Sequence, residues 1–324
     1  MLERNLMLRI KRIYMNRLKV AVLAGGISNE REVSLDTAEQ ILSNLSQEKY
    51  EVFKVEVNAD LKWIEELRNN KPDVAFIALH GKFGEDGRTQ AVLEYLGIKY
   101  TGSGVLASAF GMDKIRCSEF LSHSGLNTPK VVSFQKGVNF KEALNVVNEK
   151  ISFPCVVKPN ESGSSVGVTI CQNEEMFEQG LENAFKEDVL VLAEQYIKGQ
   201  ELTSGVLGNT GSELLALPPI EIIPHKQFFD YAAKYQKESD EICPAKISDE
   251  LAKQVQQGSV LAHKLLGCRG LTRSDFIYDG QKLFFLEINT LPGQTKESLC
   301  PKEAAAIGLS FAEFLEKQIQ LALE

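Results

Sequence analysis

An apolar segment that ends in a lysine and runs into a loop of small residues constrains this chain most strongly. Residues 155–158 have the character of a buried strand, and residues 159–167 are rich in glycine and serine. Such a loop exposes backbone N–H groups, which suit a polyphosphate held beside a lysine. A second apolar strand, 284–289, carries Glu287 and Asn289 two positions apart, so both side chains leave the same face. Oxygen ligands in this arrangement suit Mg²⁺, and together the two segments predict an enzyme that spends ATP.

The size and charge of the chain narrow the class of protein. Its 324 residues exceed a usual single domain, so two or three domains are expected. The net charge of −8 argues against a general nucleic-acid or membrane binder and indicates work on small molecules. No apolar run approaches the roughly 18–20 residues needed to span a bilayer.

Cysteine spacing and the N-terminus bear on the cellular setting. The six cysteines form no CxxC pair, and the four histidines do not cluster near them. A zinc site or disulfide framework is therefore not expected, and a reducing cytoplasm is the simplest setting. Residues 1–17 are basic, in a pattern too interrupted for a signal peptide. We expect them to be a disordered leader, with Met15 as an alternative start.

Strand and helix patterns alternate through the first third of the chain. Strands are expected at 18–24, 51–57 and 73–79, with helices at 34–45 and 61–68. This alternation predicts a parallel sheet with helices on both faces. Ligands of such sheets bind beyond the carboxyl ends of the strands, where residues 25–32 and 80–88 fall. A helical pattern then covers 103–125.

The rest of the chain reads as two α+β units, at 128–200 and 201–324. In the first, strands are expected at 155–158, 166–170 and 189–196, with a helix at 174–185. In the second, strands are expected at 201–208, 214–223, 272–278 and 283–288, with helices at 249–266 and 310–323.

Phosphate has to be held without a Walker A motif. The pair Gly25-Gly26 lacks the lysine and hydroxyl residue that would complete that motif. Lys158 and Lys114 are the candidate cations, and 163–167 is the candidate backbone cradle. A lysine taken alone is more often a surface residue, but Lys158 emerges from an apolar strand, which favours a functional role.

Oxygen ligands and one arginine fall on the last two strand patterns. Asp275, Glu287 and Asn289 form the predicted metal shell, in which Glu287 could bridge two ions. The alternative for Glu287, a solvent-facing strand residue, is disfavoured by the apolar residues before it. Arg273, two positions before Asp275, could stabilise an oxyanion. An ion pair between Arg273 and Asp275 fits the same spacing, and the sequence leaves both interpretations open.

These motifs, in this order, resemble the D-alanine–D-alanine ligases of the ATP-grasp superfamily over residues 18–324. The resemblance rests on five segments: 25–35 (GGISNEREVSL), 80–87 (HGKFGEDG), 100–104 (YTGSG), 269–275 (RGLTRSD) and 287–293 (EINTLPG). It implies an α/β and α+β chain with a three-domain ATP-grasp fold that begins with a parallel-sheet domain. The implied parts are an N-terminal substrate-binding domain at 18–112, a central ATP-grasp subdomain at 113–200 and a C-terminal catalytic domain at 201–324.

The same resemblance implies the reaction. The carboxylate of one D-alanine attacks the γ-phosphate of ATP, and the amine of a second D-alanine then displaces phosphate from the acyl phosphate. The product, D-alanyl-D-alanine, is a peptidoglycan precursor. The implied partners are D-alanine and ATP, with two Mg²⁺ ions that Mn²⁺ can replace. The implied setting is a cytoplasmic homodimer that binds neither nucleic acid nor membrane.

Residue roles are carried over by position. For the amino acids, Glu30 holds the first ammonium, His80 lies near the first carboxylate, Ser298 and Leu299 receive the second carboxylate, and Arg273 with the Gly293 N–H forms the oxyanion site. For the nucleotide, Lys114 and Lys158 bind phosphates, and Glu194, Gln195, Ile197 and Glu201 face adenine and ribose. Ser164 belongs to the closing loop over the phosphates. Lys234 and Tyr235 belong to a mobile loop, in which Tyr235 braces Ser164 and Glu30.

Departures from the family pattern are few. Gln294 stands where an apolar residue, often Met, is usual, and Gln195 replaces a common Lys. One rival is a D-alanine–D-lactate ligase, in which a tyrosine matching Tyr235 is typically absent. Another is an ATP-dependent carboxylate–amine ligase for a different amino acid. A third, a nucleotide-binding protein without catalysis, would have no use for an oxyanion donor such as Arg273.

Overall fold

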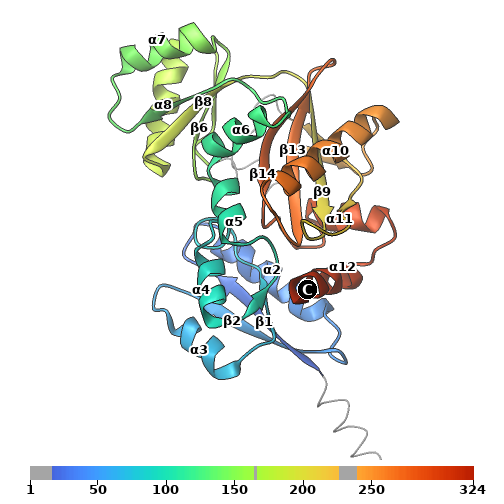
Figure 1. Ribbon diagram of the computed structural model, residues 1–324. Helices are drawn as coiled ribbons and strands as arrows, with labels where there is room; N and C mark the ends of the chain where they lie inside the picture. The colour runs from blue at the N-terminus through green and yellow to red at the C-terminus, as the bar shows by residue number, and fades with distance from the viewer. Residues whose placement is uncertain (1–16, 164–165, 226–238) are drawn as a thin grey trace, which may run out of the picture.

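Three β-sheets joined by helices make up the computed structural model, which describes residues 17–163, 166–225 and 239–324 (Figure 1). One sheet is parallel and two are antiparallel. The predicted combination of a leading α/β part with α+β parts is therefore confirmed. No helix among the described residues has both the length and the apolar character needed to cross a membrane.

The N-terminal sheet is parallel, in the order β2 (Tyr50–Val57), β1 (Leu18–Gly25), β3 (Val74–Ile77) and β4 (Lys99–Tyr100). Side chains alternate between the two faces along a strand. Ala21 and Leu23 of β1 thus join the core on one face, whereas Val20 and Val22 join the core on the other. Because both faces are buried, the strand is a continuous apolar run rather than an alternating one.

Two helices cover each face of this sheet. On one face lie α3 (Lys62–Asn70) and α4 (Arg88–Leu96), and on the other lie α2 (Arg31–Asn44) and α12 (Phe311–Leu323). The helix α12 is the last element of the chain, and its Leu315 and Ile319 complete the second core. The end of the chain therefore returns to the sheet with which it began, as Figure 1 shows.

The central sheet is antiparallel, in the order β5 (Val131–Gln135), β8 (Leu190–Gln195), β6 (Cys155–Pro159) and β7 (Thr169–Cys171). Two helices, α7 (Phe140–Lys150) and α8 (Glu174–Glu187), pack on one face. Phe177 of α8 anchors that core, with its ring centroid 6.1 Å from each of three other phenylalanine rings: Phe134, Phe140 and Phe153. The other face of the sheet is left to line a cavity.

The C-terminal sheet is also antiparallel. Its order is β12 (Ser239–Ile242), β11 (Ile220–Pro224), β9 (Gln200–Leu207), β13 (Leu271–Tyr278) and β14 (Leu283–Asn289), with β10 (Leu215–Ala216) beside β9. Behind it lie α10 (Asp249–Leu265), α5 (Val105–Met112) and α6 (Lys114–His123). Phe276 and Phe285 form the centre of this core, 5.7 Å apart and edge to face. The short helix α11 (Leu299–Ala306) contacts β9.

Several element boundaries differ from the sequence prediction for local reasons. The helical stretch 103–125 is two helices, because Asp113 ends α5 and its side chain accepts the Arg116 N–H to cap α6. The predicted strand 214–223 is split into β10 and β11, because two prolines between them have no N–H for the ladder. The strand predicted at 166–170 begins only at Thr169. The proposed domain boundaries remain a prediction.

We expect Ser310→Ala to loosen α12 from the N-terminal sheet. Ser310 accepts a hydrogen bond from the Glu313 N–H, and the Glu313 carboxylate accepts one from the Ser310 N–H, which makes a capping box. Loss of such a cap should cost about 1 kcal/mol of stability. The measurement is urea unfolding followed by the fluorescence of Trp63, the only tryptophan of the chain, which lies in the N-terminal core.

The matched control is Ser43→Ala on α2, because its exposed hydroxyl only returns to the Glu39 carbonyl one turn earlier. That variant should stay within roughly 0.5 kcal/mol of the wild type. Equal effects of the two substitutions would show that the cap does not hold α12.

Candidate active site

Two cavities meet between the sheets. The larger cavity, of about 1080 Å³, is lined mainly by residues of the N-terminal and C-terminal parts, with Ser162 and Gly163 from the loop of the central sheet. The smaller cavity, of about 730 Å³, is lined by residues of the two antiparallel sheets. Four residues line both: Lys114, Ser162, Gly163 and Glu287. A chemical group placed at this junction can contact ligands in both cavities.

The register of β13 and β14 builds the wall at the junction. Arg273 lies opposite Asn289, and Asp275 lies opposite Glu287. A bulge follows Asp275 and interrupts the alternation of side chains along β14. Phe285 is therefore buried in the core, while Glu287 and Asn289 line the cavities. The three predicted oxygen ligands are brought together on one side of the sheet.

Asp275 is already held by two neighbours. Its carboxylate accepts hydrogen bonds from Nε and Nη2 of Arg273, both at 2.8 Å, and from the Thr203 hydroxyl at 2.6 Å. Burial alone would lower the pKa of Arg273, but the charge of Asp275 outweighs it and raises the pKa. The ion pair that the sequence spacing allowed is therefore present, and it fixes the guanidinium at the edge of the larger cavity.

The donor set fits Mg²⁺ with phosphate as a further ligand. Within residues 17–163, 166–225 and 239–324, no three His, Cys, Asp or Glu side chains form a metal cluster. Two carboxylates and one amide oxygen are present instead, from Asp275, Glu287 and Asn289, and each oxygen has more than one lone pair. Mg²⁺ is commonly bound through one or two carboxylates, with water and phosphate oxygens completing the shell.

Lys158 lies at the end of β6, facing the smaller cavity. It is 8% exposed, so the alternative of a surface lysine is wrong. Its Nζ lies 2.8 Å from Glu194 Oε1 on the neighbouring strand β8. Burial would lower the pKa of Lys158, but the charges of Glu194 and Glu287 outweigh it, so the pKa is raised. The lysine therefore stays charged, and its position is set by Glu194.

Lys114 begins α6 at the junction of the cavities. Its Nζ donates to the Ser162 carbonyl at 2.7 Å and lies 3.7 Å from Glu287 Oε2. Asn160 Oδ1 accepts the Ile115 N–H, so the start of the glycine-serine loop is fastened to the first turn of α6. Lys114 and the start of this loop are therefore fixed relative to each other by two hydrogen bonds.

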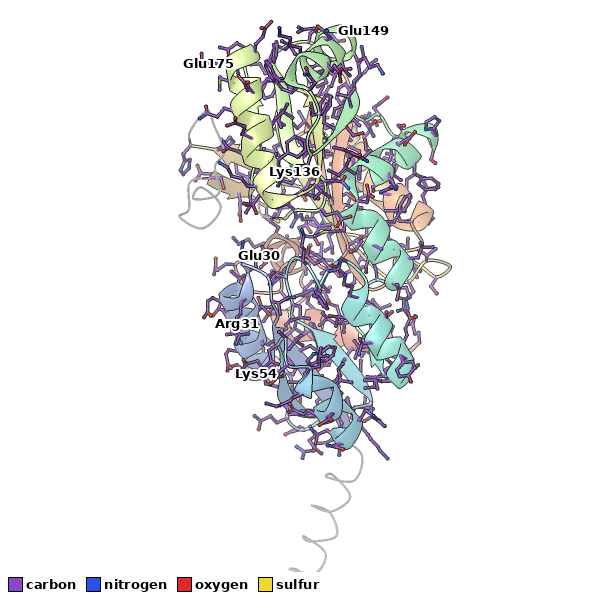
Figure 2. The ribbon with its side chains drawn as sticks, turned by 90° about the vertical axis from the view of Figure 1, so that its left-hand side faces the viewer. Glu30, Arg31, Lys54, Lys136, Glu149 and Glu175 are labelled. Carbon is purple, nitrogen blue, oxygen red and sulfur yellow. The ribbon has the colours of Figure 1, made fainter. Side chains whose placement is uncertain are left out.

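The N-terminal sheet supplies the far side of the larger cavity. Glu30 lies just before the first residue of α2. In Figure 2 this end of α2 points up, toward the central and C-terminal sheets. A Cβ added to Gly81 would come within 2.8 Å of its carboxylate, and one added to Gly163 within 3.4 Å. The predicted first-substrate residue and the phosphate loop are therefore neighbours, although they come from different sheets.

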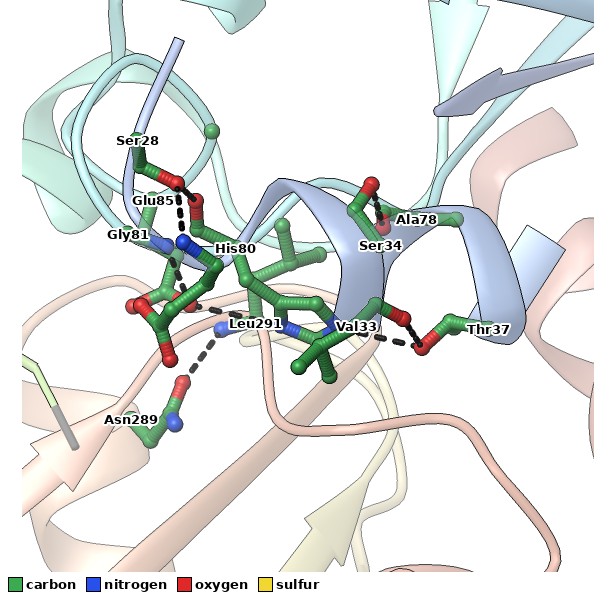
Figure 3. Close-up of polar contacts among 12 residues, drawn as sticks. Ser28, Val33, Ser34, Thr37, Ala78, His80, Gly81, Glu85, Asn289 and Leu291 are labelled. Carbon is green, nitrogen blue, oxygen red and sulfur yellow. Dashed lines mark hydrogen bonds and ion pairs between the residues drawn. The ribbon is translucent and has the colours of Figure 1, made fainter. Parts of the chain in front are cut away.

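His80 is held by contacts that orient its ring (Figure 3). Its Nε2 lies 3.2 Å from the Thr37 hydroxyl, which donates its own proton to the Val33 carbonyl at 2.8 Å. The Thr37 hydroxyl thus links the imidazole ring to the first turns of α2. On the other side, Nδ1 lies 3.7 Å from Glu85 Oε1. Glu85 was not predicted from the sequence.

The loop after β14 approaches the same cavity. Asn289 accepts the Leu291 N–H at 3.0 Å, which turns the chain sharply. A Cβ at Gly293 would lie 2.8 Å from Ser298 Oγ, so only glycine lets these two residues come so close. Gly293, Ser298 and Leu299, predicted at the second substrate, all line the larger cavity.

The smaller cavity has the lining that a flat heterocycle needs. Its apolar walls come from both antiparallel sheets: Val156, Val168, Ile170, Ile222, Ile277 and Leu286. The predicted nucleotide residues Glu194, Gln195, Ile197 and Glu201 all lie among them. Apolar walls with a few convergent polar groups are typical of small-molecule sites. Ser164, Lys234 and Tyr235 lie outside the described residues.

Two family models match the chain. The D-ala D-ala ligase N-terminus matches residues 19–72 and 65–103, and the D-ala D-ala ligase C-terminus matches residues 120–320. The chain belongs to the D-alanine–D-alanine ligase family. The ligase of Pelotomaculum thermopropionicum is 44% identical over 313 residues, 95% of this chain and 97% of the relative. That of Desulfotalea psychrophila is 45% identical over 314 residues, 95% of this chain and 96% of the relative.

Solved structures of this family have the same architecture. The D-alanine–D-alanine ligase of Bacillus anthracis complexed with ATP is similar with a TM-score of 0.81 and 34% identity, covering 94% of this chain and 97% of that one. The VanG D-Ala:D-Ser ligase of Enterococcus faecalis is similar with a TM-score of 0.84 and 32% identity, covering 94% of this chain and 99% of that one.

One buried acid in this member of the family was not predicted from the sequence. Glu303 on α11 is fully buried, and its two oxygens accept the Gly205 N–H at 3.0 and 3.2 Å. A Cβ at Gly205 would lie 2.6 Å from that carboxylate, so glycine is required for the approach. Burial raises the pKa of Glu303 to about 8, against the lowering effects of the Gly205 N–H and of Arg273. Because Gly205 lies opposite Arg273, the acid supports the strand beside the ion pair.

Glu303→Gln should change the pH dependence of stability. The folded pKa is about 8 and the ordinary value is 4.5, so the folded chain binds more protons than the unfolded chain between these values. This contribution to stability is complete below pH 4.5 and is lost as the pH rises to 8. As the pH rises through this window, the free energy of unfolding of the variant should therefore increase relative to that of the wild type. The increase should be at most ~1.4 kcal/mol per pH unit.

The measurement is denaturant unfolding followed by circular dichroism between pH 5 and pH 9. Glu178→Gln is the control, because that side chain is exposed on α8. A constant difference between Glu303→Gln and wild type over this range would contradict the raised pKa.

Proposed function

We propose that the chain joins two D-alanine molecules to D-alanyl-D-alanine, with ATP converted to ADP and phosphate. The observation that supports this most strongly is the junction of the two cavities at Lys114 and Glu287. A nucleotide in the smaller cavity can extend its phosphates to this point. An amino acid in the larger cavity, between Glu30 and His80, can bring its carboxylate to the same point.

In the first step, a carboxylate oxygen of the first D-alanine attacks the γ-phosphorus, and the bond from that phosphorus to ADP breaks. Lys114 and Lys158 offset the negative charge of the phosphates, and their positions are fixed by Ser162 and Glu194. Asp275, Glu287 and Asn289 would hold Mg²⁺, which when bound neutralises charge on the transferring phosphoryl group.

In the second step, the amine of the second D-alanine attacks the carbonyl carbon of the acyl phosphate, the bond to phosphate breaks and one proton is released. Arg273 and the Gly293 N–H would stabilise the oxyanion, and the lining of the larger cavity by both residues supports this role. Asp275 accepts the Nε N–H and one Nη2 N–H of Arg273, so the two Nη1 N–H groups and the second Nη2 N–H are the donors left for this role. Ser298 and Leu299, at the start of α11, would receive the second carboxylate.

The alternatives to this reaction differ mainly in the second substrate. The solved D-Ala:D-Ser ligase has a TM-score of 0.84 against this chain, so D-serine is a specific alternative. D-lactate as the second substrate, or a different carboxylate–amine pair, are further alternatives. We also propose a homodimer in the cytoplasm, use of two Mg²⁺ ions with Mn²⁺ as a substitute, and a role in peptidoglycan precursor synthesis.

The test is product formation by the purified full chain with ATP and Mg²⁺ across a panel of D-alanine, L-alanine, D-serine and D-lactate. We expect D-alanine alone to yield dipeptide, with one phosphate released for each dipeptide. Mixed products with D-serine or D-lactate should stay minor while D-alanine is present. Phosphate release without D-alanyl-D-alanine, or faster reaction with another acceptor, would contradict the proposal.

Glu287→Gln should reduce turnover far more than stability. The substitution keeps the size of the side chain but removes the charge at the junction of the cavities, where Lys114 Nζ lies 3.7 Å away. Losing one electrostatic catalytic group typically costs roughly 10²-fold or more in turnover. The control is Glu149→Gln, an exposed glutamate of α7 that lines neither cavity and lies far from Glu30 in Figure 2. A Glu287→Gln protein that melts early would show that Glu287 is structural, and one that keeps wild-type turnover would show that its charge is not needed for the reaction.

A further inference from the structure

Two glutamines form a closed pair inside the molecule. Nε2 of Gln294 donates to Oε1 of Gln318, and Nε2 of Gln318 donates to Oε1 of Gln294, both at 3.0 Å. The side chains are 2% and 3% exposed, so solvent does not compete for these groups. Gln318 Nε2 also lies 3.4 Å from the Phe314 carbonyl within α12. A buried amide needs such partners, which makes the pairing specific.

The pair joins two parts of the site that are distant in sequence. Gln294 follows Gly293 in the loop 290–298, which lines the larger cavity where the second substrate is proposed to bind. Gln318 belongs to α12, whose Leu315 and neighbours are packed into the core of the N-terminal sheet. That sheet carries Glu30 and His80, the residues proposed for the first substrate. The pair therefore connects the proposed sites of the two substrates.

Other contacts fasten the same loop to the N-terminal part. Leu291 is 5% exposed and belongs to the core on one face of the N-terminal sheet. The Lys296 N–H donates to Oε1 of Gln40 on α2, on the other face, at 2.8 Å. The loop begins at β14 and ends at α11, which contacts β9 of the C-terminal sheet. Its middle is nevertheless held by the N-terminal part, and Gln294 is the contact nearest to Gly293.

We propose that Gln318, acting through Gln294, is a positioning residue that sets where the second substrate lies relative to the first. This inference rests on the proposed function. Neither glutamine touches a reacting atom, but Gly293 and Ser298 take their positions from the loop that the pair holds. Displacing a positioned group by about 1 Å can cost on the order of 10²-fold in rate, so a loose loop would let water compete with the incoming amine.

The test compares four variants of the full chain: Gln318→Met, Gln294→Met, the double variant and Gln320→Met. Methionine has a similar length and flexibility to glutamine but does not replace its hydrogen bonds. Each single change takes the partner amide from the remaining buried glutamine, whereas the double change leaves no glutamine of the pair. Gln320 is an exposed glutamine of the same helix and serves as the matched control. Phosphate released and dipeptide formed are measured at saturating ATP over a range of D-alanine concentrations.

Both single variants should release more phosphate per dipeptide than wild type and need more D-alanine to restore the ratio to one. Their KM for ATP should not change, because no residue of the loop 290–298 lines the smaller cavity. The double variant should lie closer to wild type than either single variant, since the two effects are coupled. Gln320→Met should match wild type.

Three results would overturn the inference. One is a single variant with a wild-type ratio at every D-alanine concentration. The second is a fall in kcat with no change in the ratio, which a purely structural role would produce. The third is a double variant whose ratio of phosphate to dipeptide equals the sum of the two single effects. If one single variant folds poorly, the ratio of the double variant compared with that of the other single variant still decides the question. Failure of the wild type to form dipeptide would instead count against the proposed function.

Discussion

The antiparallel pairing of β13 with β14 is the constraint on which the rest of the site depends. Its register puts Asp275 opposite Glu287 and Arg273 opposite Asn289. The bulge beside Asp275 lets Phe285 stay in the core while Glu287 turns to the cavities. Without that bulge, strict alternation would place Phe285 on the same side as Glu287. The wall shared by the larger and smaller cavities therefore depends on the bulge, which interrupts the alternation of side chains along β14.

Around this wall, three cationic side chains are held in position by other groups of the protein. Lys158 is set by Glu194, Arg273 by Asp275, and Lys114 by the Ser162 carbonyl. Lys158 and Arg273 keep their charges in a largely buried setting because the carboxylates of Glu194 and Asp275 compensate for the loss of water and raise their pKa values. The neighbouring strand β9, which pairs with β13, is itself held by Glu303, whose carboxylate accepts the Gly205 N–H. Such preorganisation is what charge stabilisation in a transition state requires.

Local sequence patterns predicted much of this arrangement, and the remainder depends on contacts between distant segments. The apolar strand before Lys158 and the spacing of Glu287 and Asn289 were sufficient to single out side chains that line the cavities. The phosphate and metal roles assigned to them remain predictions. The start of α7 could also have been found, because Asn139 caps it by accepting the Lys141 and Glu142 N–H groups. By contrast, nothing near Glu303 in the sequence shows that β9 approaches it. The pairing of Gln294 with Gln318 exists only because α12 returns to the first sheet.

The most direct test of the two-cavity arrangement is a crystal structure of the full chain with ADP, Mg²⁺ and a phosphinate analogue of the acyl phosphate. The predicted result is adenine in the smaller cavity and the phosphorus of the analogue at the junction, within reach of Lys114 and Glu287. The amino-acid part should lie in the larger cavity between Glu30 and Gly293. An analogue bound away from this junction, or a nucleotide outside the smaller cavity, would contradict the assignment of both cavities.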